Sequence, residues 1–168
     1  WMAHWRPAWT QGNGFSGHLG WHQALFALES LDHAQALQLF DEHLRADPAQ
    51  ITLQRLDAAA MLWRLHLLGV DVGHRWHALL QGWNPTADSA GHYAFNDLHA
   101  LLALIGAEEL PRAHAWLQTV VDRAETATGA NREMAKHIGV PLMRGLLAFA
   151  ENRHAQAIAH IYPVRTNA

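Results

Sequence analysis

The chain of 168 residues is long enough for one domain with a substantial core, and with 50% hydrophobic and 16% charged residues it excludes long disordered stretches. Its formal net charge of −3 does not indicate nucleic-acid binding, which favours a basic surface. The chain also holds no apolar run of about 18 residues that could span a membrane. Because cysteine is absent, the composition also excludes disulfides, thiolate catalysis and zinc sites with cysteine ligands.

The start of the chain indicates a fragment of a longer protein. Residue 1 is Trp1 and not an initiator methionine, and the opening WMAHWRPAW lacks the charged region and apolar core of a signal peptide. Trp1, Trp5 and Trp9 recur four residues apart, which predicts the end of a helix whose preceding repeat is missing. We expect a cytoplasmic protein.

The first predicted helix covers residues 17–30, where apolar residues recur at helical spacing in the sequence GHLGWHQALFALE. Asp32 is a favourable N-cap for a second helix. This helix is expected to end at Asp47-Pro48, because a residue before proline is disfavoured in the helical conformation.

The third predicted helix, 51–68, is apolar on nearly all sides and is therefore expected to be buried, with Gly69 at its end. In the segment DVGHRWHALL, Trp76 is expected in the core and Arg75 at the surface or in a bridge. The stretch GWNPTADSAGHY has the composition of a loop. Further helices are predicted over residues 73–82, 95–105, 109–127, 132–150 (with a break or kink near Gly139 and Pro141) and 153–161. The total is about eight helices and no strand.

An internal repeat relates two of these regions. The segment LFALESLDHAQALQLF (25–40) aligns without gaps with LLAFAENRHAQAIAHI (146–161), and LLALIGAEELPRAHAWL (101–117) is a looser third copy. Each copy reads as an apolar helix, a short turn and a helix with alanine at a close-packing position. Helix–turn–helix units that recur in this way are typical of an α-solenoid.

The second helix indicates the type of repeat. Ala36, Phe40 and Asp47-Pro48 have the spacing of the alanine, phenylalanine and closing proline of a tetratricopeptide (TPR) unit. The first helix fits this pattern less well. The sequence therefore predicts an all-α fold of antiparallel helix pairs stacked as a TPR-like α-solenoid.

Four blocks resemble one family more closely. HLGWHQALFALESLDHAQALQLFDEHL, MLWRLHLLGVDVGHRWHALL, FNDLHALLALIGA and IGVPLMRGLLA occur in this order and are similar to the tetratricopeptide repeat protein 38-like family. The resemblance implies a single helical-repeat domain over residues 1–168, forming the central-to-C-terminal part of a longer protein. It implies a scaffold, and it supplies no catalytic residues or cofactor. The chain departs from the family pattern at PVRTNA, where no further repeat follows.

Two histidines in the first helix are candidates for a polar site. His18 and His22 are one turn apart, at the border of the apolar face. A zinc-protease helix needs glutamate directly after the first histidine, and Leu19 stands there, so that class is excluded. The favoured interpretation is a pair of partly buried, hydrogen-bonded side chains. The alternatives are contact with a ligand or peptide, and a metal site completed by His99, Asp97 or Asp57.

Asp57 and Arg64 are seven residues apart in an apolar helix and therefore share one face. Since buried charges are costly unless they are paired, the favoured interpretation is structural: each pairs with a neighbouring helix, or Arg64 bonds a carbonyl. The alternative is that both line a binding groove.

The segment FNDLH also allows both a structural and a binding interpretation. Asn96 or Asp97 is expected to be an N-cap, with Phe95 as its apolar staple. His99 points into an otherwise apolar helix and needs a partner. In a solenoid, His22, Asp57 and His99 would converge on one polar cluster.

The function predicted from these patterns is a non-enzymatic scaffold whose groove binds a peptide or protein partner, with no cofactor, nucleic acid or membrane. The main alternative is an enzyme or small-molecule binder, with or without a metal. A third is an architectural role through self-association. The candidate binding residues are His18, His22, Asp57, Arg64, Asn96, Asp97 and His99, of which His18, His22 and His99 are also the candidate metal ligands.

Overall fold

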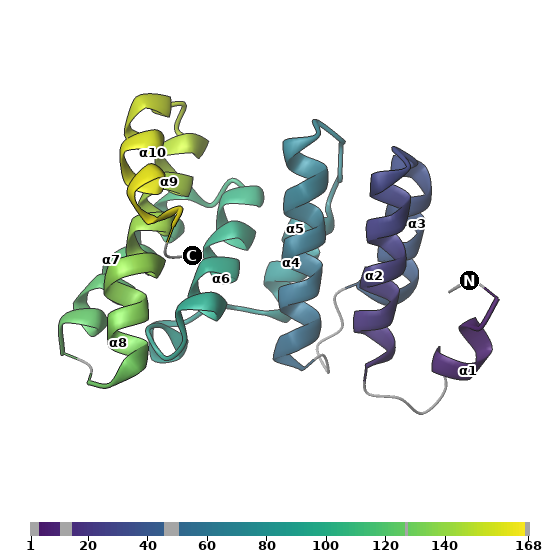
Figure 1. The fold of residues 1–168 in the computed structure, drawn as a ribbon, viewed down its shortest axis with the longest axis horizontal. Helices are drawn as coiled ribbons and strands as arrows, with labels where there is room; N and C mark the ends of the chain where they lie inside the picture. Colours follow the sequence, from purple (N-terminus) through teal and green to yellow (C-terminus); the bar gives the residue numbers. More distant parts are fainter. Residues whose placement is uncertain (1–3, 11–14, 46–50, 127, 167–168) are drawn as a thin grey trace. The chain divides into compact units, whose positions relative to one another are not determined.

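A computed structural model shows the arrangement of the helices (Figure 1). It describes residues 4–10, 15–45, 51–126 and 128–166. Throughout these ranges the regular secondary structure is helical and no strand occurs, so the predicted all-α class is confirmed. Within the same ranges, no helix has both the length and the apolar character needed to cross a membrane. Two sequence predictions fall outside the described residues: the end of a missing repeat at Trp1, and the helix stop at Asp47-Pro48.

The chain divides into two compact units, Trp1–Trp83 and Asn84–Ala168, which are described in turn. The division neither supports nor refutes the single domain predicted from the sequence, which stays a prediction.

In the first unit, α2 packs against α3 and α4, and α4 also packs against α5. The bounds of its helices are α1 Arg6–Thr10, α2 Ser16–Glu29, α3 His33–His43, α4 Thr52–Leu67 and α5 Arg75–Gly82. Asp32 caps α3 as predicted, because its carboxylate accepts the backbone N–H of Gln35 at 3.0 Å. Trp76 is buried, and Arg75 joins α5 to α3 through two hydrogen bonds to Asp41, of 2.6 and 2.9 Å.

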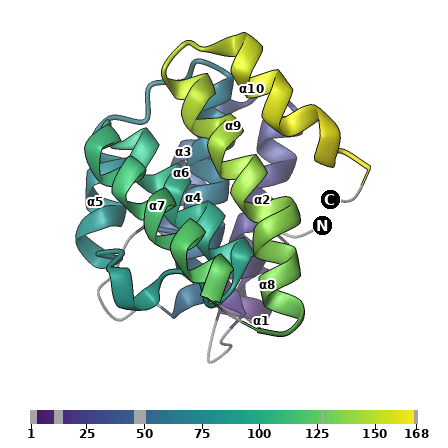
Figure 2. The same ribbon diagram turned by 90° about the vertical axis from the view of Figure 1, so that its left-hand side faces the viewer.

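In the second unit, α9 packs against α10, α6 and α7 (Figure 2). The bounds of its elements are a short 3₁₀ turn η1 Ala87–Ser89, α6 Ala94–Gly106, α7 Leu110–Thr126, α8 Ala130–Met134, a π-helical turn η2 Ala135–Gly139, α9 Val140–Ala150, α10 His154–Ile161 and a 3₁₀ turn η3 Tyr162–Val164. Leu101, Leu104, Val120 and Met143 are fully buried and form its centre.

The break predicted near Gly139 and Pro141 takes the form of the π-helical turn. Met134, Ala135, Gly139 and Val140 all keep helical dihedral angles, so α8, η2 and α9 follow one another as one rod (Figure 2). Pro141 lies two residues into α9 and removes one N–H from the hydrogen-bond ladder of this rod, next to the π-helical turn where the ladder is already irregular. At Gly139 a Cβ would come within 3.0 Å of the Cβ of Ala94, so glycine permits the close approach to α6.

Within the described ranges, the same tight turn occurs three times. It joins α2 to α3, α6 to α7 and α9 to α10, and its second residue has a left-handed φ: 57° at Leu31, 60° at Glu108 and 60° at Asn152. In every case the next N–H returns to a carbonyl five residues earlier: Asp32 to Ala27 (2.9 Å), Glu109 to Leu104 (2.9 Å) and Arg153 to Ala148 (2.8 Å). This is the Schellman arrangement, which satisfies carbonyls at the end of a helix.

The helix after each turn places an alanine in the core at the corresponding position. Ala36, Ala113 and Ala157 are 0%, 0% and 4% exposed. A related turn follows α4, where Gly69 has a φ of 72° and Val70 donates to the carbonyl of Leu65, but α5 begins later than in the other pairs. The repeat detected in the sequence therefore corresponds to a repeated local structure.

We expect Leu31→Gly and Glu108→Gly each to raise the free energy of unfolding by about 0.5–1 kcal/mol, because residues with a Cβ are strained at left-handed φ. Leu31 is 73% exposed, so its replacement removes little packing. Asn152→Gly should give a smaller gain, because asparagine tolerates this conformation. Urea unfolding measures the three changes. Ser30→Gly is the control, since Ser30 has a φ of −87° and should be destabilised instead.

Candidate functional site

In the first unit, a buried carboxylate on α4 meets an imidazole on α2. Nδ1 of His18 lies 2.9 Å from Oδ2 of Asp57, whose side chain is 8% exposed. With Nδ1 protonated, the ring donates to the carboxylate, which fixes the tautomer and the orientation of the imidazole. The two helices pack together, so the pair belongs to the contact between α2 and α4. The structural interpretation of Asp57 as a residue paired to a neighbouring helix is consistent with this contact.

Aromatic rings surround the imidazole of His18. The indole of Trp21 stacks on it with ring centroids 5.5 Å apart and an interplanar angle of 11°. The exposed ring of His22 meets His18 and Trp21 edge-on, with centroids 4.7 and 4.9 Å away. The guanidinium carbon of Arg64 lies 5.6 Å from the centre of the Trp21 ring, a cation–π distance.

We call this surface the α2–α4 face, and it consists of His18, Trp21, His22, Asp57 and Arg64. Arg64 is exposed, and it also donates to the carbonyl of Ala60 in its own helix at 2.8 Å, as one of the sequence interpretations expected. The face therefore presents a stacked indole, two imidazoles and a guanidinium around one buried acid.

No group of three or more histidine, aspartate, glutamate or cysteine side chains that could hold a metal ion occurs among the residues the structure describes. His18 and His22 are together, but His99 belongs to the second unit, where its Nδ1 lies 2.8 Å from the carbonyl of Phe95. The convergence of His22, Asp57 and His99 on one cluster stays a prediction.

In the second unit, the prediction that Asn96 or Asp97 caps a helix is wrong. Helix α6 begins at Ala94 with Tyr93 in the N-cap position, so Asn96 and Asp97 are already helical. Oδ1 of Asp97 accepts the N–H of Gly91 at 2.9 Å, and thereby holds the loop before the helix. Phe95 is 52% exposed and lies against the ring of His99, with centroids 4.4 Å apart, so it is no staple against the helix start.

Asp97 is the most unusual acid in the described part of the chain. It is 1% exposed, and its Oδ2 atom is buried without a hydrogen-bond partner there. Burial raises the pKa of this carboxyl to about 6, against the opposing effects of the Gly91 N–H, His92 and Arg123. Arg123 donates to the carbonyl of Ala90 at 2.7 Å, so the same loop is held from α7 as well.

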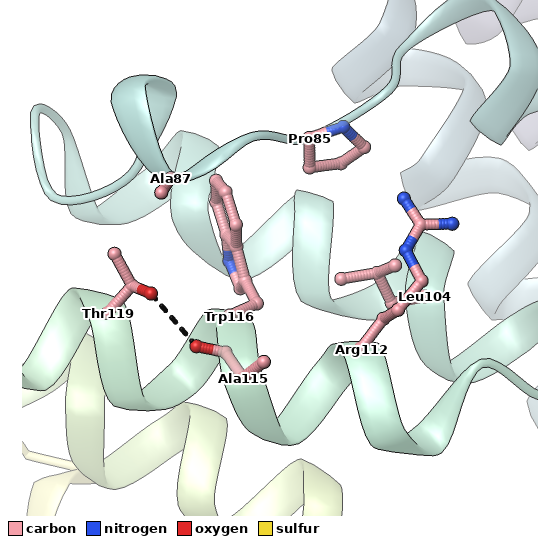
Figure 3. Close-up of a pocket in the computed structure, with 7 residues that line it drawn as sticks. All are labelled: Pro85, Ala87, Leu104, Arg112, Ala115, Trp116 and Thr119. Carbon is pink, nitrogen blue, oxygen red and sulfur yellow. Dashed lines mark hydrogen bonds between the residues drawn. The ribbon is translucent and has the colours of Figure 1, made fainter.

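A small pocket opens beside this buried acid, between η1 and α7 (Figure 3). Its volume is about 180 Å³, and its lining residues are Pro85, Ala87, Leu104, Arg112, Ala115, Trp116 and Thr119. The indole N–H of Trp116 donates to the carbonyl of Asp97 at 3.0 Å, which connects the wall of the pocket to the buried acid.

The sequence interpretation missed both Trp116 and the Arg123 contacts. Trp116 follows the buried Ala113 by three residues, as the buried Leu39 follows Ala36 in the first copy of the repeat. The looser copy at 101–117 therefore contained a signal that Trp116 is a core position. No such signal exists for Arg123, because it binds the backbone carbonyls of Asp88 in η1 and of Ala90 directly after it.

No family model matches the chain, and no solved structure matches it.

Proposed function

We propose that the chain is a non-enzymatic helical-repeat scaffold that binds a peptide or protein partner, and that its pairs are antiparallel and stack as a TPR-like α-solenoid. The observation that carries the proposal is the turn repeated after α2, α6 and α9, with the same left-handed residue and the same returning hydrogen bond. Repeat scaffolds are assembled from such units, and their extended surfaces bind partners.

The packing within each unit supports the same proposal. In the first unit, α4 packs against both helices of the α2–α3 pair. In the second unit, α9 packs against both helices of the α6–α7 pair. A first helix that contacts both members of the previous pair is what a stacked array of helix pairs requires. The resemblance of four sequence blocks to the tetratricopeptide repeat protein 38-like family points the same way.

The α2–α4 face is the proposed binding surface of the first unit, because it lies on the first helices of two successive pairs. Tryptophan and arginine are the side chains most often responsible for binding energy at protein interfaces, and Trp21 and Arg64 adjoin there. Asp57 orients His18 from beneath, so the surface is partly organised before a partner arrives.

The test is selection of peptides from a random display library on the purified chain, followed by titration of the enriched peptides. Replacing both His22 and Arg64 with alanine should weaken binding by about tenfold or more, because the variant removes two accessible side chains of the face. Both are exposed, so the fold should survive. The control is His77→Ala with Arg144→Ala, two exposed residues of the same types on other helices.

Two results would count against the proposal. One is a library that yields no peptide whose binding depends on the α2–α4 face. The other is binding of a small molecule at that face, lost in His18→Ala, which would favour the alternative of an enzyme or small-molecule binder.

A further inference from the structure

The pocket beside η1 is partly open to solvent and is lined mainly by apolar side chains. Pro85 and Ala87 form one side, and the indole of Trp116 stands between this loop and α7 (Figure 3). Because the indole N–H already donates to Asp97, the ring contributes only carbon to the cavity. Leu104 and Ala115 complete the apolar lining. Such a cavity gains free energy when it takes up an apolar group from water.

One positive charge stands at the edge of this cavity. Among the residues that the structure describes, the guanidinium of Arg112 forms one long hydrogen bond, 3.5 Å to Oδ1 of Asn84, and lies 4.0 Å from a carboxylate oxygen of Glu109. The two distances are at the outer limits for a hydrogen bond and an ion pair. Most of the five N–H donors of Arg112 therefore have no close partner on Asn84 or Glu109. No acidic residue lines the pocket.

A second polar group is available on the opposite side. The hydroxyl of Thr119 donates to the carbonyl of Ala115 at 3.0 Å, so its oxygen keeps lone pairs that can accept a hydrogen bond. Figure 3 shows the side chains of Thr119 and Arg112 on either side of Trp116. A ligand whose acidic group faces the Arg112 fork would therefore have apolar surface beside it, and the Thr119 acceptor is not required for its binding.

We propose that this pocket binds a small monocarboxylic acid with a compact apolar body, either a single aromatic ring or a short branched chain. The planar fork of a guanidinium matches a carboxylate bidentately, and the apolar body fills the space against Trp116. The volume of about 180 Å³ is smaller than a pocket for a drug-sized molecule, which sets the size of the acid. The carboxylate replaces the distant Glu109 as the partner of Arg112. The proposal does not depend on the peptide-binding function.

The experiment is titration of the full chain with benzoate, 4-methylpentanoate and the neutral analogue benzamide, followed by calorimetry and by the indole N–H resonance of Trp116. The variant Trp116→Phe identifies that resonance. For ligands of this size we expect dissociation constants of about 1 mM. Benzamide should bind about tenfold more weakly than benzoate, because it cannot form the charge-assisted pair.

Three variants locate the site. Arg112→Ala should weaken benzoate binding by about tenfold, and Arg112→Lys by less, since lysine keeps the charge without the fork. Ala115→Leu should weaken all three ligands by filling the cavity from an exposed position of α7. Arg144→Ala, an exposed arginine of the same unit outside the pocket, should change nothing.

Equal affinity for benzoate and benzamide would overturn the proposal. So would benzoate binding that is unchanged in both Arg112→Ala and Ala115→Leu, or an absence of binding at concentrations well above about 1 mM.

Discussion

Replacing Trp116 with alanine is expected to lower the free energy of unfolding by about 3–5 kcal/mol, the range for a large aromatic side chain in a core. Trp116 is 6% exposed, and its loss also removes the N–H that the carbonyl of Asp97 accepts at 3.0 Å. This change is measured from the midpoint of urea denaturation. If unfolding is two-state, the midpoint should fall with little change in slope.

The contribution of packing can be separated from that of the hydrogen bond. Trp116→Phe keeps most of the apolar surface and removes the N–H, and should cost about 1–2 kcal/mol. The exposed Trp5 provides a control for the loss of an indole as such, since Trp5→Ala should change stability by about 0.5 kcal/mol or less. A loss in Trp116→Ala no larger than in Trp5→Ala would show that Trp116 is not a core residue.

Replacing Asp97 with asparagine is expected to stabilise the protein at pH 7. In the folded state burial raises the pKa of this carboxyl from 3.8 to about 6. Between these two values the folded state binds more protons than the unfolded state, so the free energy of unfolding falls as the pH rises from about 4 to about 6. Above about pH 6 the loss of stability caused by the buried negative charge is constant. A pKa shift of this size corresponds to about 2–3 kcal/mol.

The asparagine variant avoids this penalty because it carries no charge, while its side-chain oxygen can still accept the N–H of Gly91. We therefore expect Asp97→Asn to be about 2 kcal/mol more stable than the original chain at pH 7, with the difference disappearing below about pH 4. The difference should be measured by denaturation at several pH values, since subtraction removes the titration of the histidines. Asp122→Asn, at an exposed position of α7, is the control. A stability difference independent of pH would show that Asp97 does not carry a raised pKa.

The helices could be predicted from the sequence with boundaries close to those observed. The predicted helix 17–30 is observed at Ser16–Glu29, and the predicted helix 153–161 at His154–Ile161. These segments have regular apolar spacing and clear stops, which are local properties of the chain. The HAQA repeat also identified two places where one local structure recurs.

The hydrogen-bond partner of each polar side chain could not be predicted in the same way. Asp97 follows Phe95-Asn96 in a sequence typical of a helix start, yet it bonds Gly91 in the preceding loop while Tyr93 occupies the cap position. A carboxylate close to a helix start can accept N–H groups from either direction, and only the path of the loop decides between them. The left-handed conformation of Leu31 and Glu108 could not be predicted either, because leucine and glutamate carry no signal for it.

The candidate site was predicted in part. The sequence identified His18 and Asp57 as residues needing partners, and they bond one another at 2.9 Å. It did not indicate Trp21 as the ring that stacks on His18, because tryptophan at helical spacing reads only as core. The pocket at Trp116 depends on where the loop at Pro85 and Ala87 lies against α7, which no periodicity in the sequence encodes.

The π-helical turn at Ala135–Gly139 acts as a register shift within one rod. A π turn holds one residue more than an α turn, so the side chains on its two sides are rotated by about 100° relative to an unbroken helix. Ala135 clusters with Ala94 and Ala124, of α6 and α7, whereas Gly145 lies against Ile161 of α10. The inserted residue of the turn thus changes, by about 100°, the angle between the face of the rod that packs on α6 and α7 and the face that packs on α10.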